Sequence, residues 1–349
     1  MNGKVNMVNK NKKSSLDLNN ISNLFSSEAN FTYFIRILHK QPFRIFYLAF
    51  IPKIIRRNLY IKANKLQKQH VAQCWYSFLE YYFSDGLEKF QLKAKKKFTD
   101  QKIIWQYWGQ GVHQDLPDMV RLCFSSVDRY KADYQIIRLD ENNIEDYLEL
   151  PDFVWEKKKN PKFKHAFFAD LIRLALLDVY GGVWIDTTVL LTAPIDKEIL
   201  EYDYFMFQRS QEADNKEFWH QFQHDYFDWS EEQCVNILNS FIVGKKGNNV
   251  IHTCLDILLN FWKTQNNIPH YFFFQIMFDV LMRGRFKEYQ CPIIDDTLPH
   301  LLQSRINTQF NEDDFNSILC RINIHKMTYI NKVENNSYYS YLRNYFLLD

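Results

Sequence analysis

The pattern of apolar and polar positions is most regular in the middle of the chain. Apolar side chains occupy nearly every face of the segment 165–180, which predicts a helix buried on all sides in a protein core. Tyr180, Gly181 and Gly182 end this segment, and glycine favours the left-handed backbone conformation in which helices commonly stop. Residues 183–185 (Val-Trp-Ile) then predict a short strand, so a helix, a tight turn and a strand follow one another here.

Similar patterns on both sides of this unit predict an α/β fold. Short runs of β-branched and aromatic residues alternate with longer segments of helical periodicity, which is the order expected of a nucleotide-binding half-domain. We predict strands at 102–108, 134–139, 183–185, 204–208 and 239–243, and helices at 117–127, 165–180, 248–262 and 271–282.

The first hundred residues differ from the rest in charge and composition. Residues 1–30 are rich in Asn, Lys and Ser and predict a disordered leader. Residues 31–68 hold nine Lys or Arg and no acidic residue, with aromatic and aliphatic residues between the cations. Pro42 and Pro52 divide that segment into short helical pieces, and a charged linker at 93–97 marks the expected domain boundary. The predicted division is a leader (1–30), a basic aromatic helical extension (31–98) and an α/β domain (99–349).

This extension has two interpretations. It is either a segment lying on an anionic membrane surface, with aromatic residues inserted and Lys and Arg toward the headgroups, or a helical pair packed on the α/β domain with solvated cations. No RNA- or DNA-binding motif accompanies the charge, so no nucleic-acid partner is expected. The longest uncharged apolar run nearby, 45–52, is far shorter than the roughly 20 residues that span a bilayer.

Composition and cysteine spacing bear on the compartment. Apolar residues make up 46% of the chain and aromatic residues 17%, which suffices for a substantial core. The six cysteines are scattered and form no C-x-x-C pair, a pattern that favours free thiols in a reducing compartment. The N-terminal residues lack the apolar core of a signal peptide. These features predict a cytoplasmic protein, peripheral on the inner face of the cell membrane if the extension binds lipid.

Candidate chemistry is concentrated in the central unit. Asp170 and Arg173 lie three residues apart and therefore on one face of the predicted helix. Burying charges is costly unless they are paired or bind a ligand. Asp186 and Thr188 follow the strand at its C-terminal edge, where α/β sheets bind ligands. A simpler explanation is also open: an internal Asp170–Arg173 ion pair, with Asp186 capping a turn.

The motif A-x-x-x-D-x-x-R followed by Y-G-G-V-W-I-D-x-T resembles the capsular polysaccharide synthesis glycosyltransferases. These are relatives of the family 32 sugar transferases and, more distantly, of the clostridial glucosylating toxins. The resemblance implies a GT-A-like fold, a mixed Rossmann-like sheet flanked by helices that binds a nucleotide-sugar. It also implies transfer of a sugar, of the hexosyltransferase type and with retention, to a growing capsular or cell-surface polysaccharide. The partners would be the nucleotide-sugar donor and an oligosaccharide or lipid-linked glycan acceptor.

The resemblance also implies roles for individual residues. Asp186, with Thr188, would hold a divalent metal, Mn²⁺ or Mg²⁺, on the donor diphosphate. Asp170 and Arg173 would contact the donor sugar. Trp105 would stack on the nucleobase, although a core role is the alternative. His300 would be a late metal ligand or substrate contact, although a lone histidine is commonly structural. The triplet Asp-Thr-Thr lacks the second carboxylate of the usual D-x-D motif, and a hydroxyl is a poorer ligand for a hard cation.

Other functions are compatible with the same features. The missing carboxylate favours a non-catalytic sugar-nucleotide-binding or scaffold protein of a polysaccharide-assembly complex, and an effector that glycosylates a host protein is a further alternative. Two peripheral segments also have open roles. The acidic, aromatic segment 212–232 is either an acceptor-side loop or a surface excursion, and the tyrosine-rich tail from residue 337 is either a lid or a surface-docked helix.

Overall fold

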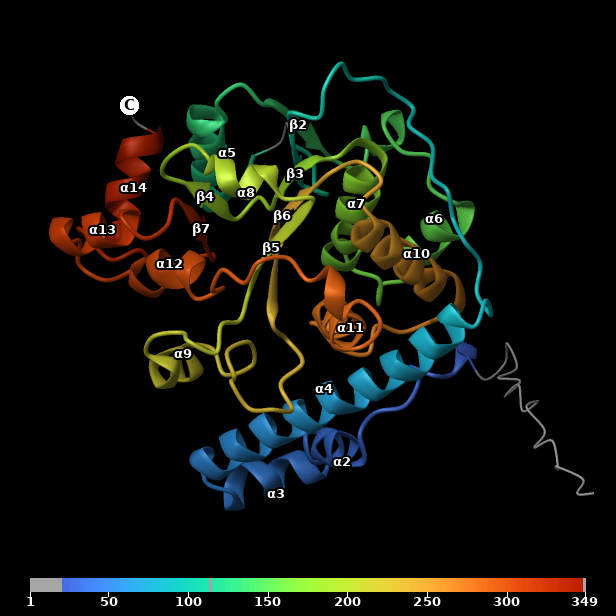
Figure 1. Cartoon of the computed structure of the whole chain (residues 1–349). Helices are drawn as coiled ribbons and strands as arrows, with labels where there is room; N and C mark the ends of the chain where they lie inside the picture. The colour runs from blue at the N-terminus through green and yellow to red at the C-terminus, as the bar shows by residue number, and fades with distance from the viewer. Residues whose placement is uncertain (1–20, 113–114, 348–349) are drawn as a thin grey trace, which may run out of the picture.

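A five-stranded mixed sheet runs through the centre of the molecule (Figure 1). The computed structural model describes residues 21–112 and 115–347. The strand order is β2-β1-β3-β6-β5, with β1, β2 and β3 parallel and β6 antiparallel to both of its neighbours. The strands are β1 (Ile103–Tyr107), β2 (Gln135–Leu139), β3 (Gly182–Ile185), β5 (Tyr204–Gln208) and β6 (Ile237–Gly244). All five predicted strands are therefore confirmed.

A second, two-stranded sheet was not predicted. It pairs β4 (Val189–Leu191) with β7 (Ile324–Lys326) in antiparallel register, with Val189 opposite Lys326. Each strand has only three residues, too few for alternation to be recognised in the sequence. This small sheet joins the C-terminal part of the chain to the segment directly after β3.

Helices pack on both sides of the central sheet (Figure 1). Helix α7 contacts β1, β3 and β6, and α10 covers α7. The body helices are α5 (Asp118–Tyr130), α6 (Asp152–Lys158), α7 (His165–Tyr180), α8 (Lys197–Glu201), α9 (Lys216–Phe222), α10 (Asn249–Thr264), α11 (Phe273–Arg283), α12 (Leu301–Arg305), α13 (Glu312–Leu319) and α14 (Tyr338–Leu347). Short 3₁₀ helices occupy Ile144–Asp146, Lys287–Tyr289 and Leu298–His300. The predicted α7 is confirmed, and it is buried along almost its whole length.

The turn from α7 into β3 depends on two glycines. Gly181 and Gly182 have φ angles of +75° and +106°, in the region where a side chain causes strain. A Cβ on Gly182 would lie only 2.4 Å from the carbonyl oxygen of Ile103. The missing side chain thus lets β3 begin directly beside β1, with no loop between α7 and the sheet.

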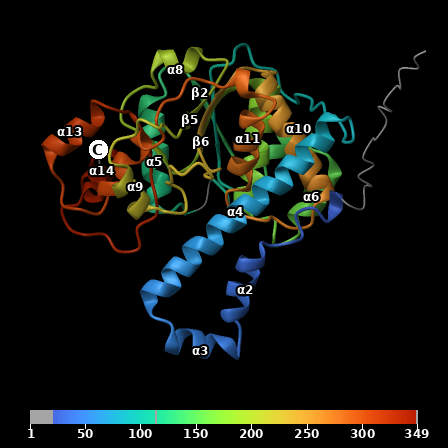
Figure 2. The ribbon, with the colours of Figure 1, turned by 60° about the horizontal axis from the view of Figure 1, so that its bottom comes forward.

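The N-terminal extension consists of α2 (Asn30–Leu38), α3 (Phe43–Phe50) and the long helix α4 (Lys53–Phe83). As predicted, Pro42 and Pro52 directly precede α3 and α4. In place of short pieces, however, a single 31-residue helix follows Pro52, because neither glycine nor proline interrupts it before Gly86. Figure 2 shows α2, α3 and the first half of α4 projecting away from the α/β body.

The second half of α4 belongs to the body. Trp75 is fully buried, and its indole Nε1 donates a hydrogen bond to the carbonyl oxygen of Phe273 in α11 at 2.9 Å. Residues 1–20 of the predicted leader lie outside the described residues, whereas Ile21 and Phe25, also predicted to be disordered, are buried. Phe25 packs edge-on against Trp75 with ring centroids 4.7 Å apart, which explains why this stretch is ordered.

The tyrosine-rich tail forms α14, which docks on α5. The hydroxyl of Ser125 donates to the carbonyl oxygen of Phe346 at 2.8 Å, and Arg343 pairs with Asp118 at 3.4 Å. Surface docking is therefore the interpretation that holds, and α14 does not cover the cavity described below. Within the described residues, no helix is both long and apolar enough to cross a membrane.

Candidate active site

A cavity of about 670 Å³ opens at the C-terminal ends of β1 and β3. This edge of a parallel sheet is the usual ligand-binding position in α/β folds, and the volume lies in the range of about 300–1,000 Å³ typical of small-molecule sites. Its wall is formed by the segment after β1, the N-terminal half of α7, the triplet after β3, the start of β6, the N-terminal end of α11, and β7 with the residues after it. Asp170, Arg173, Asp186, Thr188 and His300 all line it.

Arg173 is the centre of the polar network. Its buried guanidinium lies 3.3 Å from Asp170 Oδ1 and 3.5 Å from Asp186 Oδ1, through the same nitrogen. Its other nitrogens donate to the carbonyl oxygens of Ala169, at 3.1 Å, and Asn239. A planar guanidinium with five N–H donors suits such a junction. It connects α7, the end of β3 and β6 at one point of the cavity wall.

Asp170 is held by a second set of bonds. Asn239 Nδ2 donates to Asp170 Oδ1 at 2.8 Å, and Gln275 Nε2 donates to Asn239 Oδ1 at 3.0 Å. Burial raises the pKa of Asp170 to about 7; the nearby Asp186 adds to the increase, whereas Arg173 and Asn239 oppose it. Asp170 is thus a carboxyl group whose ionisation falls near neutral pH.

Both carboxylate oxygens of Asp186 contact polar side chains. Its backbone N–H donates to the carbonyl oxygen of Ser240 at 2.8 Å, which ties the end of β3 to β6. Oδ1 accepts a hydrogen bond from Trp184 Nε1 at 2.7 Å. Oδ2 lies 3.7 Å from the ammonium of Lys326, which also donates to the hydroxyl of Thr188. Burial lowers the pKa of Lys326, and Asp186 opposes that decrease.

Trp105 does not line the cavity. It is fully buried in β1, donates from Nε1 to the carbonyl oxygen of Gly181 at 2.9 Å, and packs against Phe98 and Tyr180. The core alternative therefore describes its position, and a nucleobase has no free indole face to stack on. Trp108, just beyond the end of β1, is partly exposed and lines the cavity in its place.

His300 and the segment 212–232 form another part of the wall. Burial lowers the pKa of His300 to about 4, so its ring is neutral at neutral pH. Its Nδ1 hydrogen-bonds with the carbonyl oxygen of Asp296 at 2.7 Å. Tyr226, from the acidic aromatic segment, lines the cavity and donates to the carboxylate of Asp296 at 2.9 Å. A buried Arg209–Asp296 ion pair at 2.7 Å supports this wall from behind.

These residues do not fit a resident divalent cation. No group of three or more His, Cys, Asp or Glu side chains is placed to hold a metal within the described parts of the chain. The side-chain oxygens of Asp186 and Thr188, which were expected to bind the metal, already contact the Lys326 ammonium. In contrast, Mg²⁺ requires nearly ideal octahedral coordination by oxygen atoms. The divalent metal thus stays a prediction from the resemblance, and no step proposed below depends on it.

Sequence reasoning missed Asn239, Gln275 and Lys326. A signal existed for Asn239, because two polar residues, Asn239 and Ser240, interrupt an otherwise apolar strand and a buried polar side chain requires a partner. Gln275 lies among aromatic residues of α11 and gave a weaker signal of the same kind. Lys326 gave none, since only the pairing of β7 with β4 brings it to the triplet.

The fold and the cavity define an α/β protein with a ligand site at the carboxyl ends of its parallel strands. A family model described as capsular polysaccharide synthesis protein matches residues 55–344. The chain belongs to this family. The match covers nearly all of the α/β body and most of α4.

Two curated relatives carry related descriptions. The chain is 27% identical over 121 residues to a protein named glycosyltransferase afumC from Aspergillus fumigatus, covering 32% of this chain and 31% of that protein. It is 23% identical over 186 residues to O-glycosyltransferase braB from Annulohypoxylon truncatum, covering 51% and 41%. The chain thus spans about a third to two fifths of the length of these relatives.

Among solved structures, the PaToxG glycosyltransferase is similar over 74% of this chain and 84% of that chain, with 12% identity and a TM-score of 0.31. A similarity this distant carries no argument about the site. The family and the relatives together support a transferase-like protein.

Proposed function

We propose that the protein is a glycosyltransferase that moves a sugar from a nucleotide-sugar donor to a growing capsular or cell-surface polysaccharide. The observation that carries this proposal is the single guanidinium of Arg173, buried between Asp170 and Asp186 on the wall of a ligand-sized cavity. An ordinary structural ion pair needs only one carboxylate and no cavity. Membership of the capsular polysaccharide synthesis family supports the same function.

The chemistry of sugar transfer matches these groups. The bond between the anomeric carbon and the phosphate oxygen breaks, and its electron pair goes to the phosphate. The acceptor hydroxyl oxygen forms the new bond to the anomeric carbon, and its proton passes to the departing phosphate oxygen. Arg173 and Asp170 would hold the sugar hydroxyls, because a guanidinium donates and a carboxylate accepts hydrogen bonds in fixed directions. Trp108 would stack on the nucleobase. A GT-A fold, a hexosyl donor and retention of configuration belong to this proposal through the family resemblance.

We also propose a site of action for the protein. It would act in the cytoplasm at the inner face of the cell membrane, on an oligosaccharide or lipid-linked acceptor. The charge and aromatic content of the N-terminal extension support this location.

The test is donor turnover by Asp186→Asn, which keeps the shape of the side chain but removes its charge. Nucleotide release from a panel of sugar nucleotides should fall by about 100-fold or more, while the unfolding temperature stays close to that of the wild type. Asp203→Asn is the matched control, since Asp203 is exposed and forms an ion pair with Lys245. Unchanged turnover by Asp186→Asn would refute the assignment. Donor binding without any turnover by the wild type would favour the scaffold function.

A further inference from the structure

Backbone pairing alone, without any charge interaction, places Lys326 beside the triplet 186–188. In the β4–β7 sheet, Lys326 pairs with Val189, the residue directly after Thr188. The N–H of the next residue, Met327, donates to the carbonyl oxygen of Thr188 at 2.7 Å. Two strands therefore hold the root of the lysine side chain at the cavity wall, and its ammonium reaches Asp186 and Thr188.

Charge in the cavity wall indicates what this ammonium faces. Two cations, Arg173 and Lys326, flank Asp186 on opposite carboxylate oxygens. About a quarter of the Lys326 side chain remains exposed, and the residue lines the cavity. Asp186 itself lines the cavity, so the ammonium that pairs with it also lies at the cavity wall. The exposed part of Lys326 is therefore within reach of an anionic ligand in the cavity.

We propose that Lys326 supplies the positive charge for the diphosphate of the donor, so that this site binds a nucleoside diphosphate without a divalent metal. The proposal rests on the proposed function. When the glycosidic bond breaks, the leaving diphosphate gains a negative charge, and an ammonium already in place stabilises it without reorganisation. The ammonium of Lys326 contacts Thr188, the residue at which a D-x-D motif has its second carboxylate, and would supply the positive charge that a metal supplies there.

The test measures binding of UDP, GDP and inorganic pyrophosphate by calorimetry, in EDTA and in Mn²⁺. The wild type should bind at least one probe in EDTA. Lys326→Met should weaken that binding by about 10- to 150-fold, the loss expected for a hydrogen bond to a charged group. Lys326→Arg should retain most of the affinity. Lys245→Met is the control, because Lys245 is an exposed lysine paired with Asp203.

A fourth variant separates this role from a structural one. Lys326→Glu supplies the missing second carboxylate, so its probe binding should be lost in EDTA and recovered in Mn²⁺. Binding by the wild type only in Mn²⁺, or unchanged binding by Lys326→Met in EDTA, would overturn the role of Lys326 and leave the transferase function standing. No binding of any probe in either condition would refute the proposed function, and this proposal with it.

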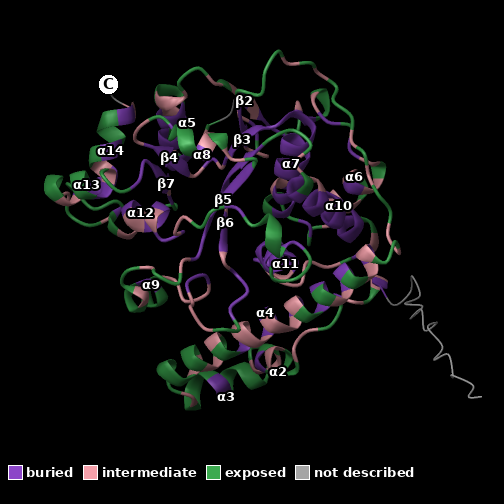
Figure 3. Cartoon of the chain, in the orientation of Figure 1, coloured by how far each residue is buried: buried purple, intermediate pink, exposed green. Residues whose placement is uncertain are grey.

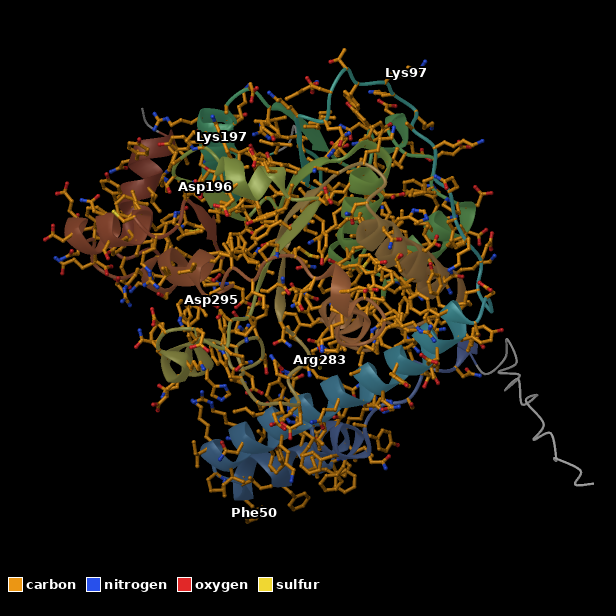
Figure 4. All side chains as sticks on the ribbon, viewed as in Figure 1. Phe50, Lys97, Asp196, Lys197, Arg283 and Asp295 are labelled. Carbon is orange, nitrogen blue, oxygen red and sulfur yellow. The ribbon has the colours of Figure 1, made fainter. Side chains whose placement is uncertain are left out.

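A separate surface supports a second proposal. The helical hairpin, residues 30–62, carries half of the exposed large hydrophobic side chains in the described part of the chain. The most exposed are Phe50, at 77%, and Ile45, Ile54 and Phe46. Figure 3 shows α3 exposed over most of its surface, and Figure 4 shows Phe50 at the far end of the hairpin, directed away from the body. Soluble proteins rarely leave so large an apolar patch uncovered.

Cations lie among these apolar side chains. Lys40, Arg44, Lys53 and Arg57 are exposed and form no ion pair with any residue that the structure describes. Arg36, in the last turn of α2, pairs with Glu28. Residues 31–70 contain no acidic residue. Their exposed aromatic side chains and unpaired cations complement a surface that is apolar in its interior and anionic at its outer layer. That description fits the headgroup region of an anionic bilayer.

The base of the hairpin lies close to the cavity in the fold. Asn64, two residues beyond the hairpin in α4, bonds with Asp225 at 2.6 Å and with His270 at 2.8 Å. The next residue after each of these, Tyr226 and Tyr271, lines the cavity. We infer that the helical hairpin docks on an anionic lipid bilayer, which would bring the cavity wall near a lipid-linked acceptor.

The second test is flotation with vesicles of phosphatidylglycerol and phosphatidylcholine, or of phosphatidylcholine alone. The wild type should bind the anionic vesicles. Phe46→Ser/Phe50→Ser, which removes a stacked exposed pair on α3, should lower the partition coefficient by about tenfold or more. Arg44→Gln/Lys53→Gln should lower it by about fivefold for each cation lost. Phe218→Ser/Phe222→Ser removes an equivalent stacked pair on α9 and should have no effect.

Equal loss of binding in the α9 control, or no binding of the wild type to anionic vesicles, would overturn this proposal. Concentration-dependent self-association through the hairpin in size-exclusion chromatography, with no vesicle binding, would identify a second copy of the chain as its partner instead. Neither outcome depends on whether the cavity turns over a donor.

Discussion

Two tryptophans three residues apart have different environments. Trp105 is fully buried in β1, whereas Trp108 lies beyond the strand in the cavity wall. The position of each residue along the strand explains this result, because a central strand buries both of its faces and only residues at or past its end reach the C-terminal edge.

This difference predicts opposite effects of two equivalent substitutions. Trp105→Ala should cost about 3–5 kcal/mol of unfolding free energy, because it empties a packed core site. Trp108→Ala should leave stability nearly unchanged but weaken nucleotide binding by about 1–3 kcal/mol, the usual contribution of base stacking. Denaturant unfolding and calorimetry check the two effects. If Trp105→Ala impaired nucleotide binding without loss of stability, Trp105 and not Trp108 would be the residue that binds the nucleobase.

Asp170 predicts a pH dependence. Because burial raises its pKa to about 7 in the folded protein, the folded state binds this proton more tightly than the unfolded state. Its contribution to stability is therefore complete below the ordinary carboxyl pKa and is lost as the pH rises through about 7. Relative to Asp170→Asn, the wild type should lose stability as the pH rises from about 4 to about 7, by at most about 1.4 kcal/mol per pH unit. Parallel pH profiles of unfolding free energy would contradict this.

At the scale of elements, the turn between α7 and β3 sets the geometry of the site. It places the polar face of α7 and the end of β3 on one cavity, and both of its glycines have positive φ angles. A longer connection would separate Arg173 from Asp186.

A pair of glycine substitutions tests this turn. Gly247 also has a positive φ angle, but an added Cβ there would meet nothing within 4 Å. Gly247→Ala should therefore cost about 1–2 kcal/mol, from backbone strain alone. Gly182→Ala should cost more, about 3 kcal/mol or above, because its Cβ would also collide with the carbonyl of Ile103. Chemical denaturation measures both, and equal costs would show that the close approach to β1 is unimportant.

At the scale of the whole molecule, α4 joins two regions with different surfaces. Its first half carries the hairpin, and its second half packs on α11 within the same core as the sheet. The residues around 98 therefore lie between segments that share one core, although they mark a change of composition.

We therefore expect the extension and the α/β body to unfold together. Thermal unfolding followed by far-UV circular dichroism, to which the long α4 contributes strongly, should coincide with unfolding followed by tryptophan fluorescence. Trp75→Phe, which removes the hydrogen bond to α11, should lower both midpoints equally. Two separate transitions would show that the extension is an independent unit.

The sequence by itself determined the five central strands, the buried helix α7 and the residues Asp170, Arg173 and Asp186. These follow from local periodicity, from the glycines and from charges placed where burial requires a partner. The tertiary structure alone decided that Trp108 and not Trp105 lines the cavity, and that Lys326 lies beside Asp186. Both depend on which chain segments meet in space: the first on where a strand ends, the second on the pairing of β4 with β7, which brings Lys326 to Thr188, 138 residues away in the sequence. A local sequence pattern does not predict such contacts, because nothing in either segment specifies the segment with which it pairs.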